Sequence, residues 1–84
     1  MMSYNRSAAK DALAWTILHG GYFVVKTALT TGGVAAGIID KYTARQITKL
    51  LGKLSPSLKR TAWSHYEKTG NIWEMVELAA GNKL

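Results

Sequence analysis

Apolar and polar residues alternate with the period of an α-helix along most of the chain. In the first half, eight apolar or small residues fall within an arc of about 140° when plotted at 100° per residue. They are Leu13, Ala14, Ile17, Leu18, Gly21, Val24, Val25 and Ala28. Ser7 can serve as an N-cap before this segment, and residues 30–33 are typical of its end. Glycine weakens a helix interior by about 1 kcal/mol, so we expect a kink or a close helix contact at Gly20-Gly21.

A second helical segment is expected to begin near Gly33. Gly33 and Gly37 are four residues apart, a small-residue spacing that lets another helix approach closely. Residues 40–43 are expected to interrupt this segment, and residues 43–46 have the spacing of a capping box that would restart it. These patterns predict apolar, glycine-containing helices over residues 8–40.

The most regular pattern in the chain lies between residues 41 and 54. Apolar residues follow the spacing i, i+3, i+4, i+7, at Ile47, Leu50, Leu51 and Leu54. Basic residues recur at every fourth position on the other side of the helix, at Lys41, Arg45, Lys49 and Lys53. Both spacings match the helical period, so they predict a basic amphipathic helix over residues 41–54.

Two further helices are predicted near the C-terminus. Ser55 as N-cap and Pro56 at the first helical position indicate a helix over residues 56–68. Residues 71–74 have capping-box spacing and open a last helix over residues 72–80. Its apolar stripe consists of Ile72, Met75, Val76 and Ala79. No segment has the alternation of a strand, so the prediction is one all-α domain over residues 1–84, a compact bundle of four or five short helices.

Composition restricts the class of partner that is expected for this domain. The chain has 84 residues, with 11 Lys+Arg against 5 Asp+Glu and a net charge of +6. Residues 41–60 contain six basic residues and no acid, so they carry a charge equal to that of the whole chain. A strongly basic segment favours a polyanionic partner, either an anionic membrane surface or nucleic acid. The absence of cysteine excludes a disulfide framework and thiolate metal sites.

Catalytic chemistry is not indicated. His19 and His65 are far apart in the sequence, and neither has a carboxylate or a second histidine at the spacing of metal ligands. The serines lack the context of an activated nucleophile, and the glycine pairs do not follow a strand. We therefore expect no catalytic residues, no metal, no cofactor and no enzymatic activity.

The first functional hypothesis is binding to an anionic membrane surface. Lys41, Arg45, Lys49, Lys53, Lys59 and Arg60 would contact anionic headgroups, at about 1 kcal/mol for each basic residue. The leucines and Ile47 of the basic helix would enter the acyl boundary. Aromatic residues that would anchor at headgroup level are Trp15, Tyr22, Trp63, Tyr66 and Trp73, of which about half are expected in the core instead.

Two alternatives stay open. Residues 43–60 can be aligned with a helix-turn-helix, with Gly52 at the turn and with Lys59 and Arg60 facing phosphates or base edges. This alternative describes a small DNA-binding protein of phage or plasmid type. The other alternative is a small protein-binding module in which the basic residues form a solvated face.

A cysteine-free, basic, tryptophan-bearing helical chain resembles the circular and leaderless bacteriocins, which form saposin-like bundles. Residues 32–41 also resemble the glycine-rich membrane segments of some microcins. The resemblance implies an antimicrobial protein that depolarises bacterial membranes, with the basic helix binding first and residues 12–39 inserting afterwards. Self-association, an immunity protein and a receptor stay open as further partners.

The resemblance also implies secretion. Arg6 and Lys10 precede an apolar stretch, but Asp11 and Lys26 interrupt it, so no conventional signal peptide is predicted. The protein would then be exported by another route and act at the target cell membrane. The alternative location is the cytoplasm.

Overall fold

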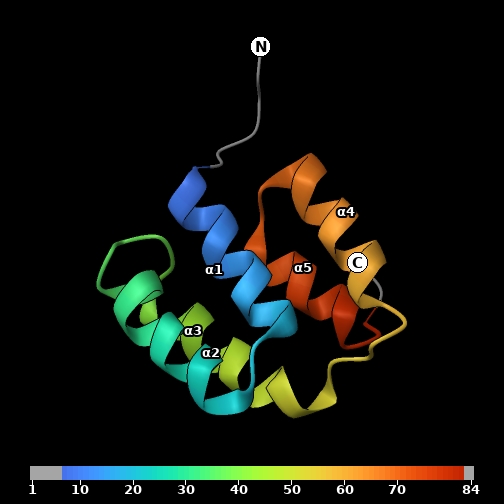
Figure 1. The fold of residues 1–84 in the computed structure, drawn as a ribbon, viewed down its shortest axis with the longest axis horizontal. Coiled ribbons are helices and arrows are strands. Elements are labelled where there is room, and N and C mark those ends of the chain that lie inside the picture. Colours follow the sequence, from blue (N-terminus) through green and yellow to red (C-terminus); the bar gives the residue numbers. More distant parts are fainter. Residues whose placement is uncertain (1–6, 83–84) are drawn as a thin grey trace.

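Five α-helices and two short helical segments of other types make up the protein (Figure 1). The computed structural model describes residues 7–82. The elements are α1 (Ala8–His19), α2 (Tyr22–Ala28), the π-helix η1 (Leu29–Val34), α3 (Lys41–Leu50), the 3₁₀-helix η2 (Leu51–Lys53), α4 (Lys59–Thr69) and α5 (Ile72–Ala79). Residues 7–82 contain no strand, which confirms the all-α prediction.

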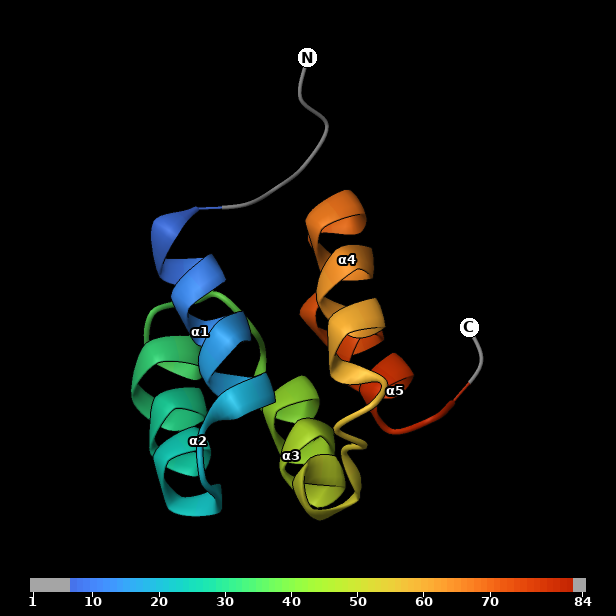
Figure 2. The same cartoon turned by 45° about the vertical axis from the view of Figure 1, so that its right-hand side comes forward.

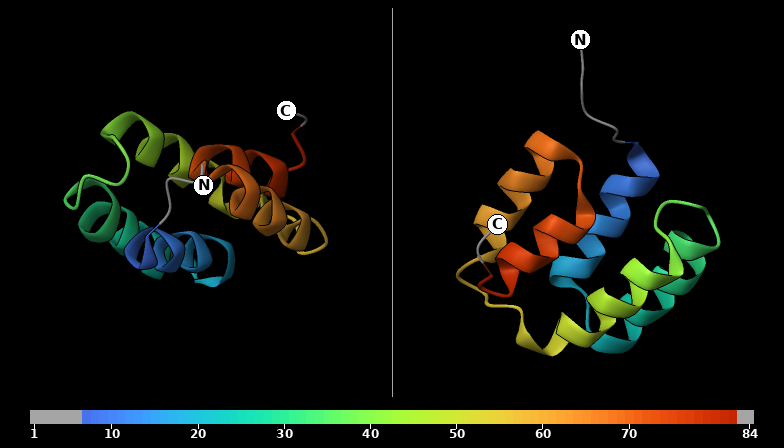
Figure 3. Two further views of the ribbon diagram at one scale, coloured as in Figure 1. Left: turned by 90° about the horizontal axis from the view of Figure 1, so that it is seen from above. Right: turned by 180° about the vertical axis from the view of Figure 1, so that it is seen from behind.

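The short helix α5 is the centre of the packing. It contacts α1, α3 and α4, and its most extensive contact is with α4. Seen from above, α1 and α2 lie on one side of the molecule and α3 lies on the other (Figure 3, left). The predicted apolar stripe of the last helix is confirmed, since Ile72, Met75, Val76 and Ala79 are all buried.

The core is made of apolar side chains and one tyrosine. Besides the stripe of α5, it contains Leu13, Ala14, Ile17, Leu18, Val25, Leu29, Ile47, Ala62 and Tyr66. Among the described residues no other polar or charged residue is buried.

Two of the helices around this core begin at the predicted caps, where a side-chain oxygen accepts a hydrogen bond from a backbone N–H. Ser7 Oγ accepts from the Lys10 N–H at 3.1 Å, and Asn71 Oδ1 accepts from the Glu74 N–H at 3.0 Å.

The glycine pair ends the first helix instead of bending it. Helix α1 stops at His19, and the Gly20 N–H donates to the Thr16 carbonyl at 2.7 Å. The chain then extends through Gly21 and starts α2 at Tyr22. Because the helical phase is interrupted here, Val24 does not continue the apolar face of α1. The prediction that it would lie on the buried arc is wrong, since it is 59% exposed.

The predicted helix end at residues 30–33 is also wrong. The helix continues through them as η1, in which the Thr30 and Thr31 hydroxyls donate to carbonyls one turn earlier. The turn comes later, at Gly37, whose φ of +75° favours glycine. No second helix begins at Gly33. A loop side chain makes the close approach there instead, because a Cβ on Gly33 would lie 3.0 Å from Ile39.

The cap of α3 and the start of α4 differ from the predictions. Asp40, not Thr43, is the N-cap of α3, and its Oδ1 accepts from the Thr43 N–H at 2.6 Å. Hydrogen bonds from the Thr43 backbone and side chain lower the pKa of Asp40. Helix α4 begins at Lys59, after a turn in which the Leu58 N–H donates to the Ser55 carbonyl. Ser55 itself donates its N–H to the Ala79 carbonyl, which ties this turn to the end of α5.

The two glycines between α1 and α2 should differ in their tolerance of a side chain. A Cβ on Gly20 would lie 2.8 Å from the Thr16 carbonyl oxygen and 3.1 Å from Val25, whereas Gly21 has open space. We expect Gly20→Ala to lower the free energy of unfolding by about 1–3 kcal/mol. In Gly21→Ala, alanine restricts the unfolded chain, which stabilises the protein, but it is a poorer N-cap than glycine, which destabilises it. The free energy of unfolding should therefore change by less than about 0.5 kcal/mol. Urea denaturation followed by circular dichroism measures both, and equal effects would contradict this account of the break.

Candidate membrane-binding surface

The six predicted lipid-binding cations form two groups. Lys41, Arg45 and Lys49 lie on the exposed side of α3, and Lys53 continues them in η2. The spacing of four residues places them opposite the buried Ile47. Lys59 and Arg60 lie in the first turn of α4, where Lys59 is half-buried and Arg60 is exposed.

The apolar side of the basic helix is not available for lipid in this fold. Ile47 is fully buried, and the three leucines of this segment pack against the core. The expectation that these residues enter the acyl boundary is therefore wrong for the folded protein. An apolar contact with lipid has to come from other side chains.

Helices α1 and α4 bring aromatic and basic residues together in one cleft of about 520 Å³. We call it the aromatic-basic cleft, and it is lined by Trp15, His19, Pro56, Lys59, Arg60 and Trp63. The rings of Trp15 and Trp63 meet edge to face, with centroids 5.7 Å apart and an interplanar angle of 90°. His19 lies 3.9 Å from Trp15 between ring centroids. None of the lining residues is acidic, so the two cations of the cleft, Lys59 and Arg60, lie beside two tryptophans with no carboxylate in the lining.

Tyr66 supports this cleft from inside the protein. Its side chain is fully buried, and its ring lies 5.2 Å from that of Trp63. Its hydroxyl donates to Asp11 Oδ1 at 2.7 Å and so connects α4 to α1. Tyr66 therefore belongs to the core, and not to the surface where a membrane anchor would lie. Trp73 on α5 is half-buried and also packs against the core, away from the cleft.

The start of α2 extends the surface with Tyr22, a predicted anchor, and with Phe23, which the sequence patterns did not single out. Tyr22 and Lys59 both line a smaller cavity of about 110 Å³, together with Leu51 and Gly52. Phe23 is 79% exposed, and its ring lies 5.6 Å from that of Tyr22. The helical period itself could have indicated this exposure, because Phe23 falls outside the apolar arc when plotted at 100° per residue.

Among residues 7–82, the other large exposed aromatic residue away from this surface is Tyr42, at 70% exposure, which the sequence patterns also missed. It lies on α3, and none of its ring contacts joins it to the aromatic-basic cleft.

The helix-turn-helix alignment does not match the observed segment. Gly52 lies inside η2, and α4 begins seven residues later, at Lys59. Helix α3 packs mainly on η1 and α5, whereas α4 packs mainly on α5 and α1. The two helices are thus held through a third helix and do not form a compact pair of their own.

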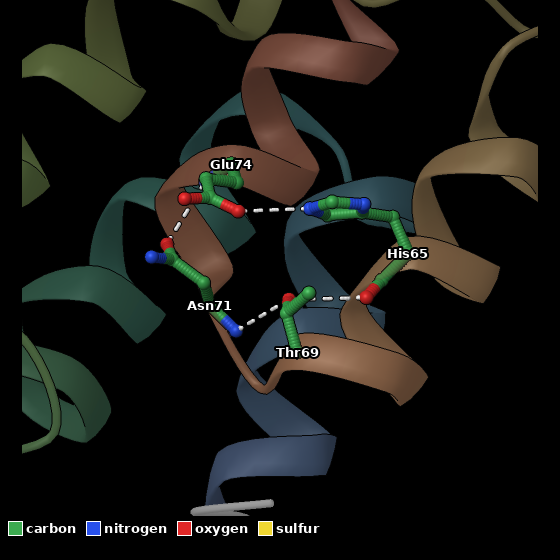
Figure 4. A network of polar contacts seen from close by, with 4 residues as sticks. All are labelled: His65, Thr69, Asn71 and Glu74. Carbon is green, nitrogen blue, oxygen red and sulfur yellow. Dashed lines mark hydrogen bonds and ion pairs between the residues drawn. The ribbon is translucent and has the colours of Figure 1, made fainter. Parts of the chain in front are cut away.

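A polar network joins the end of α4 to the start of α5 (Figure 4). His65 Nε2 lies 2.9 Å from Glu74 Oε1, a partner nine residues away that the sequence spacing did not reveal. The Thr69 hydroxyl donates to the His65 carbonyl and accepts from the Asn71 N–H. Within residues 7–82 no three metal-ligating side chains are grouped, so this network orients two helices.

Comparisons with known proteins place the chain in no family. No family model matches it, and no match was found to a curated protein or to a solved structure. None of the helices within residues 7–82 combines the length and the apolar character needed to cross a membrane.

The buried tyrosine gives a test of how the cleft is supported. Tyr66→Phe removes the hydroxyl that bonds to Asp11, so we expect the free energy of unfolding to fall by about 1–2 kcal/mol. Tyr42→Phe is the matched control, since Tyr42 is exposed and should change stability by less than about 0.5 kcal/mol. Urea denaturation measures both variants. Equal stabilities would show that the bond to Asp11 contributes nothing.

Proposed function

We propose that this protein binds anionic bacterial membranes at its surface and permeabilises them. The observation that carries the proposal is the joining of exposed aromatic rings and unopposed cations on one continuous surface. That surface comprises the aromatic-basic cleft and the start of α2. Lys59 lines both the cleft and the small cavity, and Tyr22 lines the small cavity beside it. Tryptophan and tyrosine rings favour the headgroup level of a bilayer, and cations favour anionic headgroups.

Binding would begin with electrostatic attraction. The net charge of +6 draws the protein to an anionic surface, and Lys59 and Arg60 then contact headgroups beside the rings. Phe23 and Trp15 are 79% and 55% exposed, so they can enter the interface without any unfolding of the core.

Permeabilisation would follow from this shallow insertion. Rings that enter one leaflet increase its area relative to the other, and the strain opens transient defects. This route needs no spanning helix, and it replaces the sequence-based idea that residues 12–39 insert. Leu13, Ile17 and Leu18 of that segment form part of the core, so their insertion would require unfolding.

Vesicles provide the direct test. Mixed phosphatidylglycerol and phosphatidylcholine vesicles should shift the tryptophan emission to the blue and release an enclosed dye, whereas phosphatidylcholine alone should do neither. Absence of both effects on the anionic vesicles would overturn the proposal. Duplex DNA that displaces the protein from vesicles and binds it more tightly would favour the nucleic-acid alternative.

A pair of aromatic variants tests the surface itself. Phe23→Ser should weaken binding to anionic vesicles by about tenfold, because it removes an exposed ring from the start of α2. Tyr42→Ser removes a comparably exposed ring from α3 and should weaken binding by less than about twofold. Vesicle sedimentation measures both affinities. Equal losses would show that no particular surface faces the membrane.

A pair of charge variants on one helix completes the test. Arg60→Gln and Lys68→Gln each remove one exposed cation from α4, but only Arg60 lines the cleft. We expect Arg60→Gln to weaken vesicle binding about fivefold and Lys68→Gln by less than about twofold. A general dependence on net charge would instead give the same loss in both variants.

A further inference from the structure

A groove between two antiparallel helical segments carries chemistry that the surface described above does not use. The segment α2–η1 and helix α3 run in opposite directions side by side (Figure 2). The groove between them has a volume of about 410 Å³. Its lining residues are Lys26, Leu29, Thr30, Val34, Lys41, Ala44, Arg45, Thr48 and Lys49.

The base of the groove is apolar. Leu29 is buried, and Val34 and Ala44 are half-buried. The two threonine hydroxyls donate to backbone carbonyls within their own helices, Thr30 to Lys26 and Thr48 to Ala44. Their hydroxyl protons are thus already used, and the side-chain donors left for a ligand are those of the four cations.

The charge around the groove has one sign. Lys26 comes from α2, and Lys41, Arg45 and Lys49 come from α3. None of the four has an ion-pair partner among residues 7–82, and no acidic residue lines the groove. Like charges around one apolar groove repel one another, so a bound anion would lower their mutual repulsion.

One wall of the groove is an unusual helix. Leu29, Thr30 and Val34 belong to the π-helix η1. Such helices are rare and frequently occur at functional sites.

The size of the groove suits a small amphiphile. From Lys41 to Lys49, α3 rises by about 12 Å along one wall of the groove. The volume of the groove falls within the range of about 300–1,000 Å³ that is typical of small-molecule sites.

We propose that this groove binds one acyl chain of an anionic lipid, with the headgroup held by the cations at its rim. The inference rests on the proposed membrane binding and deepens it, because it names the part of the lipid that is recognised. The chain would lie on the half-buried Val34 and Ala44, above the buried Leu29, and the headgroup would contact Arg45 and its neighbours. Membrane docking through the aromatic-basic cleft does not require this groove, so the two proposals can fail separately.

A soluble probe tests the site without a bilayer. Titration of the full-length protein with decyl phosphate, below its micelle concentration, should show saturable binding of one molecule by calorimetry. Decyl maltoside keeps the chain and removes the negative charge, and inorganic phosphate keeps the charge and removes the chain. Both should bind at least about tenfold more weakly. Equal binding of either control, or binding without saturation, would overturn the inference.

Two variants locate the binding in the groove. Ala44→Leu should fill the groove and weaken decyl phosphate binding at least about tenfold, whereas Ala12→Leu on the exposed side of α1 should not. Arg45→Gln lies on the exposed rim, where it should not affect folding, and should weaken binding about fivefold. If Ala44→Leu does not fold, Arg45→Gln alone tests the proposed location. Unchanged affinity in Arg45→Gln, or in a folded Ala44→Leu, would overturn the proposed location.

The outcomes separate this inference from the proposed function. Vesicle binding without decyl phosphate binding would overturn the groove site and leave membrane docking intact. Decyl phosphate binding without vesicle binding would overturn membrane docking alone. Displacement of decyl phosphate from the groove by an acidic amphipathic peptide that binds more tightly would assign the groove to a protein partner instead.

Discussion

The burial of the apolar stripe of α5 between three other helices is the interaction on which the rest of the structure depends. Helix α5 has eight residues, a length at which an isolated helix is not stable in water. Its stability therefore comes from packing against α1, α3 and α4 and from the cap at Asn71. Because α1, α3 and α4 all pack on α5, this helix positions the walls of the aromatic-basic cleft and of the groove beside α3. It lines neither of them itself.

The same packing decides where the charges lie. No charged side chain is buried among residues 7–82, so every cation there is left at or near the surface. Because α3 buries Ile47 against the core, its basic row faces the groove beside α2–η1. Because α4 packs on α1 and α5, its first basic residues lie beside two tryptophans. One basic stretch of sequence thus contributes cations to two surfaces of different chemistry, one lined by aromatic and one by aliphatic side chains.

Local patterns were sufficient where a helix has one clearly apolar side and a polar cap. The basic helix was predicted over residues 41–54 and is observed as α3 followed by η2, and the stripe of α5 was predicted correctly. Patterns failed where tertiary contacts outweigh local preference. The two glycines of η1 do not end the helix, since the chain folds Ile39 over Gly33 and closes the turn at Gly37. Tyr66 resembled a surface anchor because Asp11, the partner of its hydroxyl, is distant in the sequence.

The sequence by itself determined an all-α chain and the position of its basic segment, because these depend on residue type and helical period alone. Tertiary structure alone decided which aromatic residues are exposed and which cations lie together. The physical reason is that exposure depends on helical phase and on contacts between distant segments. A break of two residues at Gly20 and Gly21 interrupts the helical phase between α1 and α2, and so exposes Val24, which the apolar arc predicted to be buried.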